Sequence, residues 1–128
     1  MSKASWVFQL NDDPRGIVRT LAPGIETRIF PGQQVMLSVV RIEPNARGTV
    51  HSHPEEQWGV LLEGQCTRIQ DGQEVACAVG DFWCTPGGAM HGIYTGEVGA
   101  VVLDIFSPPR EEYKQAGKGF GAAAVKAG

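Results

Sequence analysis

The stretch HSHPEEQWGVLLEG, residues 51–64, contains the pattern that decides how this chain folds. His51 and His53 are two positions apart, so in an extended strand their side chains point to the same face. Gln57 has the same parity and lies just past a turn candidate, so it can return to that face. The stretch therefore predicts that two histidines and a neutral amide gather on one side of a sheet.

The same β-rich pattern continues on both sides of this stretch. Short runs of strand-forming residues alternate with turn residues such as Pro31-Gly32 and Glu63-Gly64. Helical periodicity is confined to a turn or two near 110–116. The expected strands are Ile25–Phe30, Val35–Ile42, Gln57–Leu62, Gln65–Gln70, Glu74–Val79, Asp81–Thr85, His91–Thr95 and Ala100–Phe106. Eight strands at this spacing predict an all-β sandwich or barrel.

One hairpin can be predicted residue by residue. Asp71-Gly72 is a strong two-residue turn signal, because both central positions of such a turn need a positive φ. If these residues form the turn, Arg68 pairs with Val75. Cys66 then lies opposite Cys77, either as two small apolar residues of a sheet or as a redox-sensitive pair. The chain's three cysteines contain no CxxC pair, and reduced thiols are the expectation in the cytosol.

The bulk composition limits the class of protein. With 128 residues, the chain is expected to form a single domain, residues 1–128. A net charge of −3 argues against nucleic-acid binding, and 42% hydrophobic against 20% charged residues argues against disorder. The sequence has no apolar run long enough for a signal peptide or a membrane span, so we expect a cytoplasmic protein with no membrane contact.

The two ends of the chain differ from its middle. Residues 114–128 are rich in glycine and alanine and are expected to form a flexible tail. At the other end, Trp6 and Phe8 belong to a run that could add a strand to a partner subunit. A homodimer is the expected assembly.

The third histidine of the chain is distant in sequence but can reach the first two. His91 follows an expected strand, a Pro86-Gly87-Gly88 turn and the start of the next strand. The turn can bring His91 against His51 and His53. Imidazole can accept a metal or a proton, so the sequence brings three such acceptors together.

These two segments resemble the motifs of the cupin family. H-x-H-x3-Q-x6-G, residues 51–64, is similar to the first cupin motif, and G-x5-P-x-G-x2-H, residues 80–91, is similar to the second. The resemblance covers a core of about residues 35–110 and implies a double-stranded β-helix, or jelly-roll, barrel that holds one divalent metal. Three positions depart from the pattern: Asn45 replaces a glycine, Thr95 an asparagine, and Gln57 the usual glutamate ligand.

By this resemblance, the metal ligands are His51, His53, Gln57 and His91. The metal is one divalent transition ion, and Fe, Mn, Ni, Zn and Co suit imidazole and amide ligands about equally well. Four neutral ligands leave the full charge on the ion, which favours an anionic substrate. Glu55 and Glu56 are alternative ligands by chemistry, but parity and the turn place both of them in solvent at the mouth of the barrel.

A second informative segment closes the last expected strand. Asp104 interrupts an apolar run, and a buried carboxylate needs a partner or a role. The pattern D-x-F-S-P-x-R-E, residues 104–111, resembles the ending of pectin-degradation cupins that convert unsaturated monouronates into linear keto forms. The resemblance implies that Asp104 transfers a proton, that Arg110 clamps a substrate carboxylate, and that Phe106 shapes the pocket. Alternatively, Asp104 and Arg110 merely pair to seal one end of the barrel.

Three hypotheses for the function follow from this interpretation. The first is a metal-dependent isomerase or lyase that acts on a small anionic, sugar-derived substrate such as an unsaturated uronate. The second is a metal-dependent cupin dioxygenase, and the third is a non-catalytic cupin that binds a small ligand. The neutral ligand set favours the first, because it lacks the two-histidine, one-carboxylate arrangement of many iron oxygenases.

Overall fold

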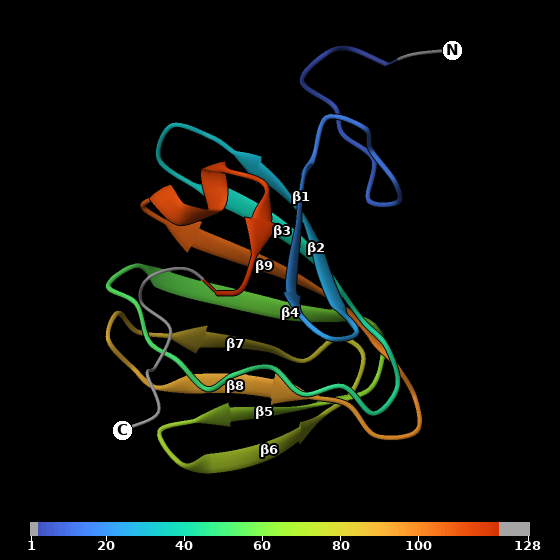
Figure 1. Cartoon of the computed structure of the whole chain (residues 1–128), viewed down its shortest axis with the longest axis vertical. Helices are drawn as coiled ribbons and strands as arrows, with labels where there is room; N and C mark the ends of the chain where they lie inside the picture. The colour runs from blue at the N-terminus through green and yellow to red at the C-terminus, as the bar shows by residue number, and fades with distance from the viewer. Residues whose placement is uncertain (1–2, 121–128) are drawn as a thin grey trace.

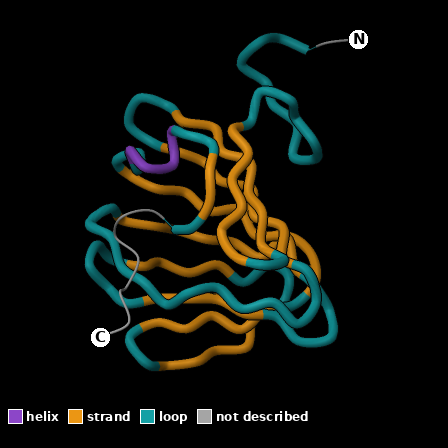
Figure 2. The backbone as a smooth tube through the Cα atoms, in the orientation of Figure 1, coloured by secondary structure: helices purple, strands orange, loops and turns teal. Residues whose placement is uncertain are grey.

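The computed structural model describes residues 3–120 of the chain, and almost all of its regular structure is β (Figures 1 and 2). Its strands are β1 (Ile17–Ala22), β2 (Ile25–Pro31), β3 (Met36–Ile42), β4 (Glu56–Gly64), β5 (Cys66–Gln70), β6 (Gln73–Cys77), β7 (Phe82–Thr85), β8 (His91–Tyr94), β9 (Ala100–Ser107) and β10 (Gly117–Lys118). A short 3-10 helix, η1 (Glu111–Lys114), separates β9 from β10. Within residues 3–120, no helix is long and apolar enough to cross a membrane.

The strands form two sheets that face each other, as in a jelly roll. The larger sheet has the order β10-β1-β2-β3-β9-β4-β7, and the smaller has the order β6-β5-β8. The sheets occupy separate parts of the ribbon, with β4 and β7 next to the smaller sheet (Figure 1). The fold is therefore all-β, as the sequence predicts, although the two sheets remain separate and do not close into one continuous barrel.

Each of the eight predicted strands is present, with ends within two residues of the predicted ones. The Asp71-Gly72 turn has φ values of 47° and 84°, which confirms a turn with two left-handed residues. The predicted register follows, with Arg68 opposite Val75 and Cys66 opposite Cys77. Local turn chemistry was sufficient to set this register.

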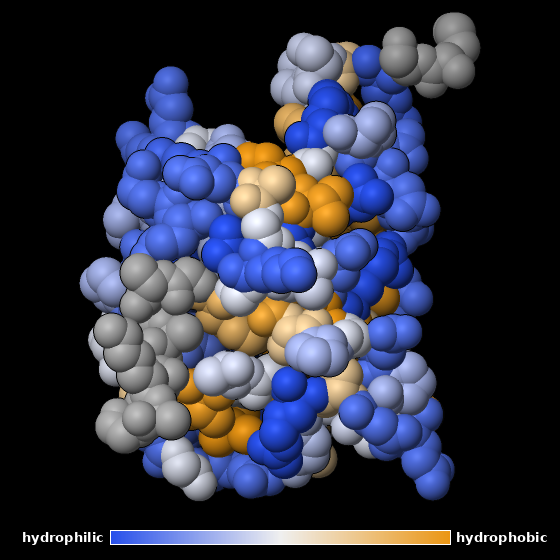
Figure 3. Space-filling model, in the orientation of Figure 1, coloured by the Kyte–Doolittle hydropathy of each residue, from blue (hydrophilic) through white to orange (hydrophobic). Residues whose placement is uncertain are grey.

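The hydrophobic core lies between the two sheets. Ile29, Met36 and Leu61 are fully buried in it, and Val102 on β9 packs with them. In the space-filling view, hydrophilic residues cover most of the face shown, and hydrophobic residues are visible in separate patches between them (Figure 3). The core fixes the inward face of β3, β4 and β9, and these strands carry much of the candidate site.

The first strand, β1, lies before the first strand expected from the sequence. It pairs with β2 across the turn at residues 23–24. Arg19 occupies an inward position of β1 and is buried, which interrupts the apolar alternation that would identify a strand. Arg19 is buried because its hydrogen-bond partners lie far away in the sequence, in the C-terminal segment.

Arg19 holds the segment that follows η1. Its guanidinium donates to the backbone carbonyls of Glu112, Gln115, Lys118 and Gly119 at distances of 2.8–3.2 Å. Short parallel pairing between β1 and β10 adds to this attachment. The first part of the expected flexible tail, up to residue 120, is therefore docked on the body of the protein, and residues 121–128 lie outside the described residues.

The N-terminal segment is irregular within the single chain, and its addition as a strand to a partner subunit stays a prediction. Residues 3–16 contain no strand, and the Phe8 ring packs on Phe30 with their centroids 5.2 Å apart. Trp6 is 79% exposed. Asp13 and Arg15 form an ion pair of 2.8 Å that fixes the path of the chain into β1.

Candidate metal and acid site

The two histidine segments are joined by backbone hydrogen bonds. The His51 amide donates to the His91 carbonyl at 2.9 Å, and the His91 amide donates to the His51 carbonyl at 2.8 Å. This isolated antiparallel bridge places both side chains on the same inward face. The sequence prediction that His91 approaches the first pair is therefore supported by direct pairing.

The turn between β7 and β8 completes the approach. The Gly88 amide, at a φ of 85°, donates to the His53 carbonyl at 2.8 Å. A Cβ at Gly87 would lie 2.2 Å from the Pro54 carbonyl oxygen, so this close contact requires a glycine. Gly87 and Gly88 thus clamp the second histidine segment onto the first.

All three imidazole rings are oriented by the same kind of hydrogen bond, from Nδ1 to a backbone carbonyl. The Nδ1 atoms of His51, His53 and His91 lie 2.7, 3.1 and 2.9 Å from backbone carbonyls two residues away. A carbonyl only accepts, so each Nδ1 carries the hydrogen and each Nε2 keeps its lone pair. The ligating atoms of the three side chains lie within 4.8 Å of one another. Rings oriented in this way are typical of histidines that bind a metal.

Burial keeps these imidazoles neutral. It lowers the pKa of His51 to about 4 and the pKa of His91 to about 2, and it also lowers the pKa of His53. The nearby guanidinium groups of Arg110 and Arg68 act in the same direction. At neutral pH the rings are therefore free bases, which is the protonation state that a metal ligand requires.

Gln57 faces the histidines from β4. Its Oε1 lies 3.0 Å from His53 Nε2, which keeps its lone pair because Nδ1 carries the hydrogen. Two acceptor atoms at this distance repel each other unless a cation lies between or beside them. His91 Nε2 is also buried and has no hydrogen-bond partner among residues 3–120. The donor set of three imidazoles and an amide therefore fits a divalent transition metal.

The two glutamates beside Gln57 have different surroundings. Glu56 is exposed, as predicted, and accepts a hydrogen bond of 2.7 Å from Trp58 Nε1. The prediction of a solvated position is wrong for Glu55, whose side chain is only 14% exposed. Its Oε1 lies 3.4 Å from His53 Nδ1 and 3.9 Å from Arg110 Nε, because these cationic or polarised groups attract the carboxylate inward. Glu55 supports the outer nitrogen of His53 and faces away from its Nε2.

Asp104 projects from β9 toward the same cavity. Burial raises its pKa to about 6, against the opposing influence of the Arg68 guanidinium. Its Oδ1 is shielded from solvent and has no hydrogen-bond partner in the described part of the chain. A Cβ at Gly59, the residue opposite on β4, would lie 2.8 Å from Asp104 Oδ1 and 2.4 Å from Trp83 Nε1. Gly59 therefore leaves the space that this carboxylate occupies.

Arg110 is completely buried, although it follows the last long strand. Its guanidinium lies over the Tyr113 ring at 4.1 Å and donates through Nη2 to the carbonyl of Phe120. Its Nε and Nη1 are buried without hydrogen-bond partners within residues 3–120. Arg110 forms its ion-pair contact with Glu55 and none within 4.0 Å of Asp104, so the two do not simply pair to seal the fold.

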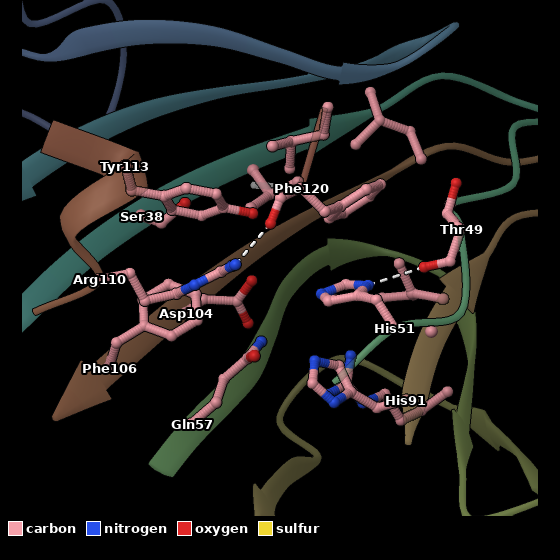
Figure 4. A pocket seen from close by; sticks show the side chains of 17 residues that line it. Ser38, Thr49, His51, Gln57, His91, Asp104, Phe106, Arg110, Tyr113 and Phe120 are labelled. Carbon is pink, nitrogen blue, oxygen red and sulfur yellow. Dashed lines mark hydrogen bonds between the residues drawn. The ribbon is translucent and has the colours of Figure 1, made fainter. Parts of the chain in front are cut away.

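The remaining walls of the cavity are aromatic. Phe106 lies edge-on to His53, and Phe120 lies over His51 with ring centroids 4.4 Å apart. Figure 4 shows Gln57, Asp104 and Arg110 facing His51 and His91 across the cavity, with Phe120 beside them. The free volume is about 30 Å³. This is room for one or two water-sized molecules, and the Phe120 ring limits it.

Arg68 also lines this cavity, and it was not predicted from the sequence. Arg68 lies on an inward position of β5 and is 6% exposed. Its Nη2 donates to Thr85 Oγ1 at 2.9 Å. The register set by the Asp71-Gly72 turn places Arg68 on the same face as Cys66, and this was the available signal for an inward position. Arginine is usually exposed, however, so a residue of this type favours a prediction of a solvent-facing position.

The two other departures from the family pattern are accommodated locally. Asn45 adopts a φ of 57°, the left-handed conformation that the usual glycine would supply. Thr95 is buried, accepts from the Ala46 amide at 3.1 Å and donates to the Glu43 carbonyl at 2.6 Å. These contacts fix the loop that leads to His51.

Comparisons with known proteins agree with the fold and with the resemblance to pectin-degradation cupins. The Cupin domain family model matches residues 38–106. The pectin degradation protein KdgF of Dickeya dadantii (strain 3937) is 28% identical over 95 residues, which are 73% of this chain and 86% of that protein.

Two solved structures resemble the chain over most of its length. The structure of KdgF from Halomonas sp. has a TM-score of 0.71 at 28% identity and covers 82% of this chain and 96% of that one. An RmlC-like cupin from Shewanella frigidimarina NCIMB 400 has a TM-score of 0.73 and covers 88% and 96%, at 23% identity. The second likeness concerns the fold alone.

Proposed function

Because the chain belongs to the Cupin domain family, we propose that it is a metal-dependent enzyme that converts a small anionic, sugar-derived substrate into an isomeric product. The favoured substrate is an unsaturated uronate, which would be opened to its linear keto form. The relation to pectin degradation proteins supports this substrate class. One observation carries the proposal: His51, His91, Gln57, Asp104 and Arg110 line a single cavity, and the ligating atom of His53 lies within 4.8 Å of those of His51 and His91.

We propose that His51, His53, Gln57 and His91 hold the metal through their Nε2 and Oε1 atoms. When bound, a divalent ion would supply Lewis acidity toward a hydroxyl or carbonyl oxygen of the substrate. Because all four ligands are neutral, the bound ion keeps its full charge and favours an anion in the cavity.

Asp104 is suited to transfer a proton. Its pKa of about 6 lies close to neutral pH, where a group can both accept and return a proton efficiently. Asp104 lines the cavity, and its Oδ1 has no hydrogen-bond partner among residues 3–120, so carboxylate lone pairs are available to a substrate hydroxyl or carbon acid. We assign Asp104 the role of general base or acid.

Arg110 is suited to bind the substrate carboxylate. Its Nε and Nη1 are buried and have no hydrogen-bond partner among the described residues. A planar guanidinium can donate two parallel hydrogen bonds to a carboxylate, which fixes the orientation of the acid. Phe106 and Tyr113 flank the guanidinium and would shape the pocket around the ligand.

The proposal requires movement of the C-terminal segment. A free volume of about 30 Å³ is far smaller than a sugar acid, and Phe120 forms one wall of it. Displacement of residues 115–120 would open the cavity and release Arg110 from the Phe120 carbonyl. The framework of strands that carries the histidines, Gln57 and Asp104 can stay in place.

Elemental analysis of the purified protein, combined with a screen of unsaturated uronates, tests this function. We expect about one divalent ion per chain and loss of the ultraviolet absorbance of the unsaturated uronate on turnover. A metal-bearing protein that leaves every unsaturated uronate untouched would remove this substrate class. Oxygen uptake that depends on added Fe(II) would instead indicate a dioxygenase.

We also propose that the protein is a homodimer that uses the outer face of the larger sheet. Leu37, Trp58 and Phe82 are 37%, 41% and 69% exposed on β3, β4 and β7. Ile105 on β9 pairs with Leu37 on β3 and with Trp58 on β4, so an apolar row crosses these three neighbouring strands. Light scattering of the wild-type protein and of Trp58→Glu tests this assembly; a monomeric wild type contradicts it.

A further inference from the structure

Arg68 is a buried cation that crosses from one sheet to the other. It starts on β5 of the smaller sheet, and its guanidinium reaches Thr85 on β7 of the larger sheet. The residue is 6% exposed, and the Trp83 ring lies 5.5 Å from the guanidinium carbon. A guanidinium remains charged even when buried, so this position places a permanent positive charge at the cavity wall.

Neutral groups hold this guanidinium in place. Thr85 donates its single hydroxyl hydrogen to Gln70 Oε1 at 2.7 Å, so its oxygen accepts from Arg68. Gln70 is itself fixed, because its Nε2 donates to the Cys84 carbonyl at 3.0 Å. The chain of hydrogen bonds sets the orientation of Arg68 without neutralising its charge.

No carboxylate among residues 3–120 lies within 4.0 Å of the Arg68 guanidinium nitrogens. Its Nε is buried and has no hydrogen-bond partner in that part of the chain. A buried charge without a contacting counter-charge is costly. A purely structural link between the sheets would not need this cost, because a neutral side chain could fill the same space.

Arg68 and Arg110 approach the cavity from opposite flanks. Arg110 lies with Tyr113 and Phe120, in the segment that docks on β1, whereas Arg68 bonds to β7 at the far edge of the same sheet. The strands β9 and β4, which carry Asp104 and Gln57, lie between them. The cavity is therefore lined by two guanidinium groups, with Asp104 and Gln57 between them in the order of the strands.

We propose that Arg68 is a second substrate-binding residue, which donates hydrogen bonds to oxygen atoms at the end of the ligand opposite to the carboxylate held by Arg110. This inference rests on the proposed function and specifies it further. The matching ligand is a polyhydroxy acid with oxygen acceptors at both ends. A short acid that offers only a carboxylate would satisfy Arg110 and leave Arg68 without a partner.

The test compares Arg68→Met and Arg68→Lys with the wild type and with Arg47→Met as a control, since Arg47 is exposed, lies over the Tyr94 ring and does not line the cavity. The probes are galacturonate, a saturated uronate that serves as an unreactive ligand, and propionate, a short acid. Calorimetric titration of the metal-loaded proteins measures both affinities. Melting temperature and metal content report on folding and on the metal site.

We expect Arg68→Met to weaken galacturonate binding by about tenfold to a hundredfold, the range expected for a lost hydrogen bond to a charged group. Propionate binding should change much less, metal content should stay at the wild-type level, and Arg68→Lys should restore part of the affinity. Arg47→Met should behave as wild type. If Arg68→Met binds galacturonate as tightly as wild type does, Arg68 is only a structural link and the inference is wrong.

Two further outcomes separate this inference from the proposed function. A wild type that neither turns over nor binds any uronate refutes the function, and inorganic phosphate then serves as the probe for Arg68 as an oxyanion donor. If Arg68→Met does not fold, Thr85→Val keeps the charge and removes its orientation. Thr85→Val should then weaken galacturonate binding, and unchanged binding in that variant overturns the inference.

Discussion

Arg110 donates a hydrogen bond to the backbone carbonyl of Phe120, so the guanidinium that the proposed function assigns to the substrate is engaged by the chain itself. The same segment places the Phe120 ring over His51 and is anchored at its other points by Arg19. Each pair of parallel guanidinium donors includes Nη2, so a substrate carboxylate bound by two parallel hydrogen bonds would compete with the Phe120 carbonyl for that nitrogen. Opening of the segment and binding of an acid are then linked steps.

The Phe120→Ala variant should weaken this closure without removing any proposed ligand or acid. Loss of the ring uncovers His51, so a chelator should strip the metal faster than from wild type, and KM for a uronate should fall. The cost in stability should be about 3 kcal/mol, the low end of the range for a buried phenylalanine, because Phe120 keeps 8% of its surface exposed. Stopped-flow chelation and steady-state kinetics measure the two effects.

Phe82→Ala is the matched control, because Phe82 is 69% exposed on the outer face of β7. It should leave both chelation and KM unchanged. If Phe120→Ala releases metal no faster than Phe82→Ala, the Phe120 ring does not limit access to the histidines.

The Gln57→Glu variant tests why a neutral amide faces the histidines. The introduced carboxylate should still bind the metal, but it would cancel one unit of charge and lower the Lewis acidity at the substrate. Turnover should fall by about tenfold or more, since that electrostatic contribution is worth several kcal/mol. Metal content by elemental analysis should match wild type.

Gln73→Glu provides the control, because Gln73 is an exposed residue beside the β5–β6 turn. It adds the same charge away from the site and should leave turnover unchanged. Loss of metal from Gln57→Glu, with metal retained in Gln73→Glu, would show that Gln57 is not a simple ligand.

Features set by local chemistry could be predicted from the sequence. The Asp71-Gly72 turn fixes the register between β5 and β6, because two successive residues with positive φ form a two-residue hairpin turn. The spacing of His51, His53 and Gln57 likewise places them on one face, because strand parity is a local property. His91 could be assigned through the second family motif.

The features that were missed depend on partners far away in the sequence. Arg19 is buried because it binds carbonyls of residues 112–119. A charged residue at this inward position breaks the apolar alternation, so β1 could not be predicted as a strand. Arg68 is also buried through a distant partner, because its guanidinium donates to Thr85, 17 positions later. Glu55 turns inward because Arg110, 55 positions later, lies 3.9 Å from its carboxylate. Single-strand periodicity contains no information on such contacts.

Cys66 and Cys77 should remain reduced in the native protein. They are cross-strand neighbours, and burial raises the pKa of the Cys66 thiol to about 12. The thiolate is the reactive form, so Cys66 should not react with a thiol reagent at pH 8 until the protein unfolds. Thiol counts in native and denatured protein, before and after mild oxidation, measure this protection. Joint loss of both thiols on oxidation of the folded protein would instead identify a redox pair.

Asp104 should make the metal-free protein less stable as the pH rises. Its pKa is about 6 in the folded state and close to the ordinary 3.8 when unfolded. Between these values the unfolded chain releases the proton and the folded chain keeps it, so the free energy of unfolding falls with rising pH. Above about pH 6 the full effect is present, and at ~1.4 kcal/mol per pH unit it amounts to about 3 kcal/mol.

The Asp104→Asn variant removes this ionisation. In the presence of a chelator it should match the wild type near pH 4 and exceed its unfolding free energy by about 3 kcal/mol at pH 7–8. Urea titrations at several pH values measure the difference, with Asp12→Asn as the control, since Asp12 is exposed and asparagine tolerates its φ of 56°. The same variant should lose turnover when metal is restored, because the amide cannot accept the proton. A variant that gains stability but keeps full turnover would show that Asp104 is buried in the cavity without acting as the base.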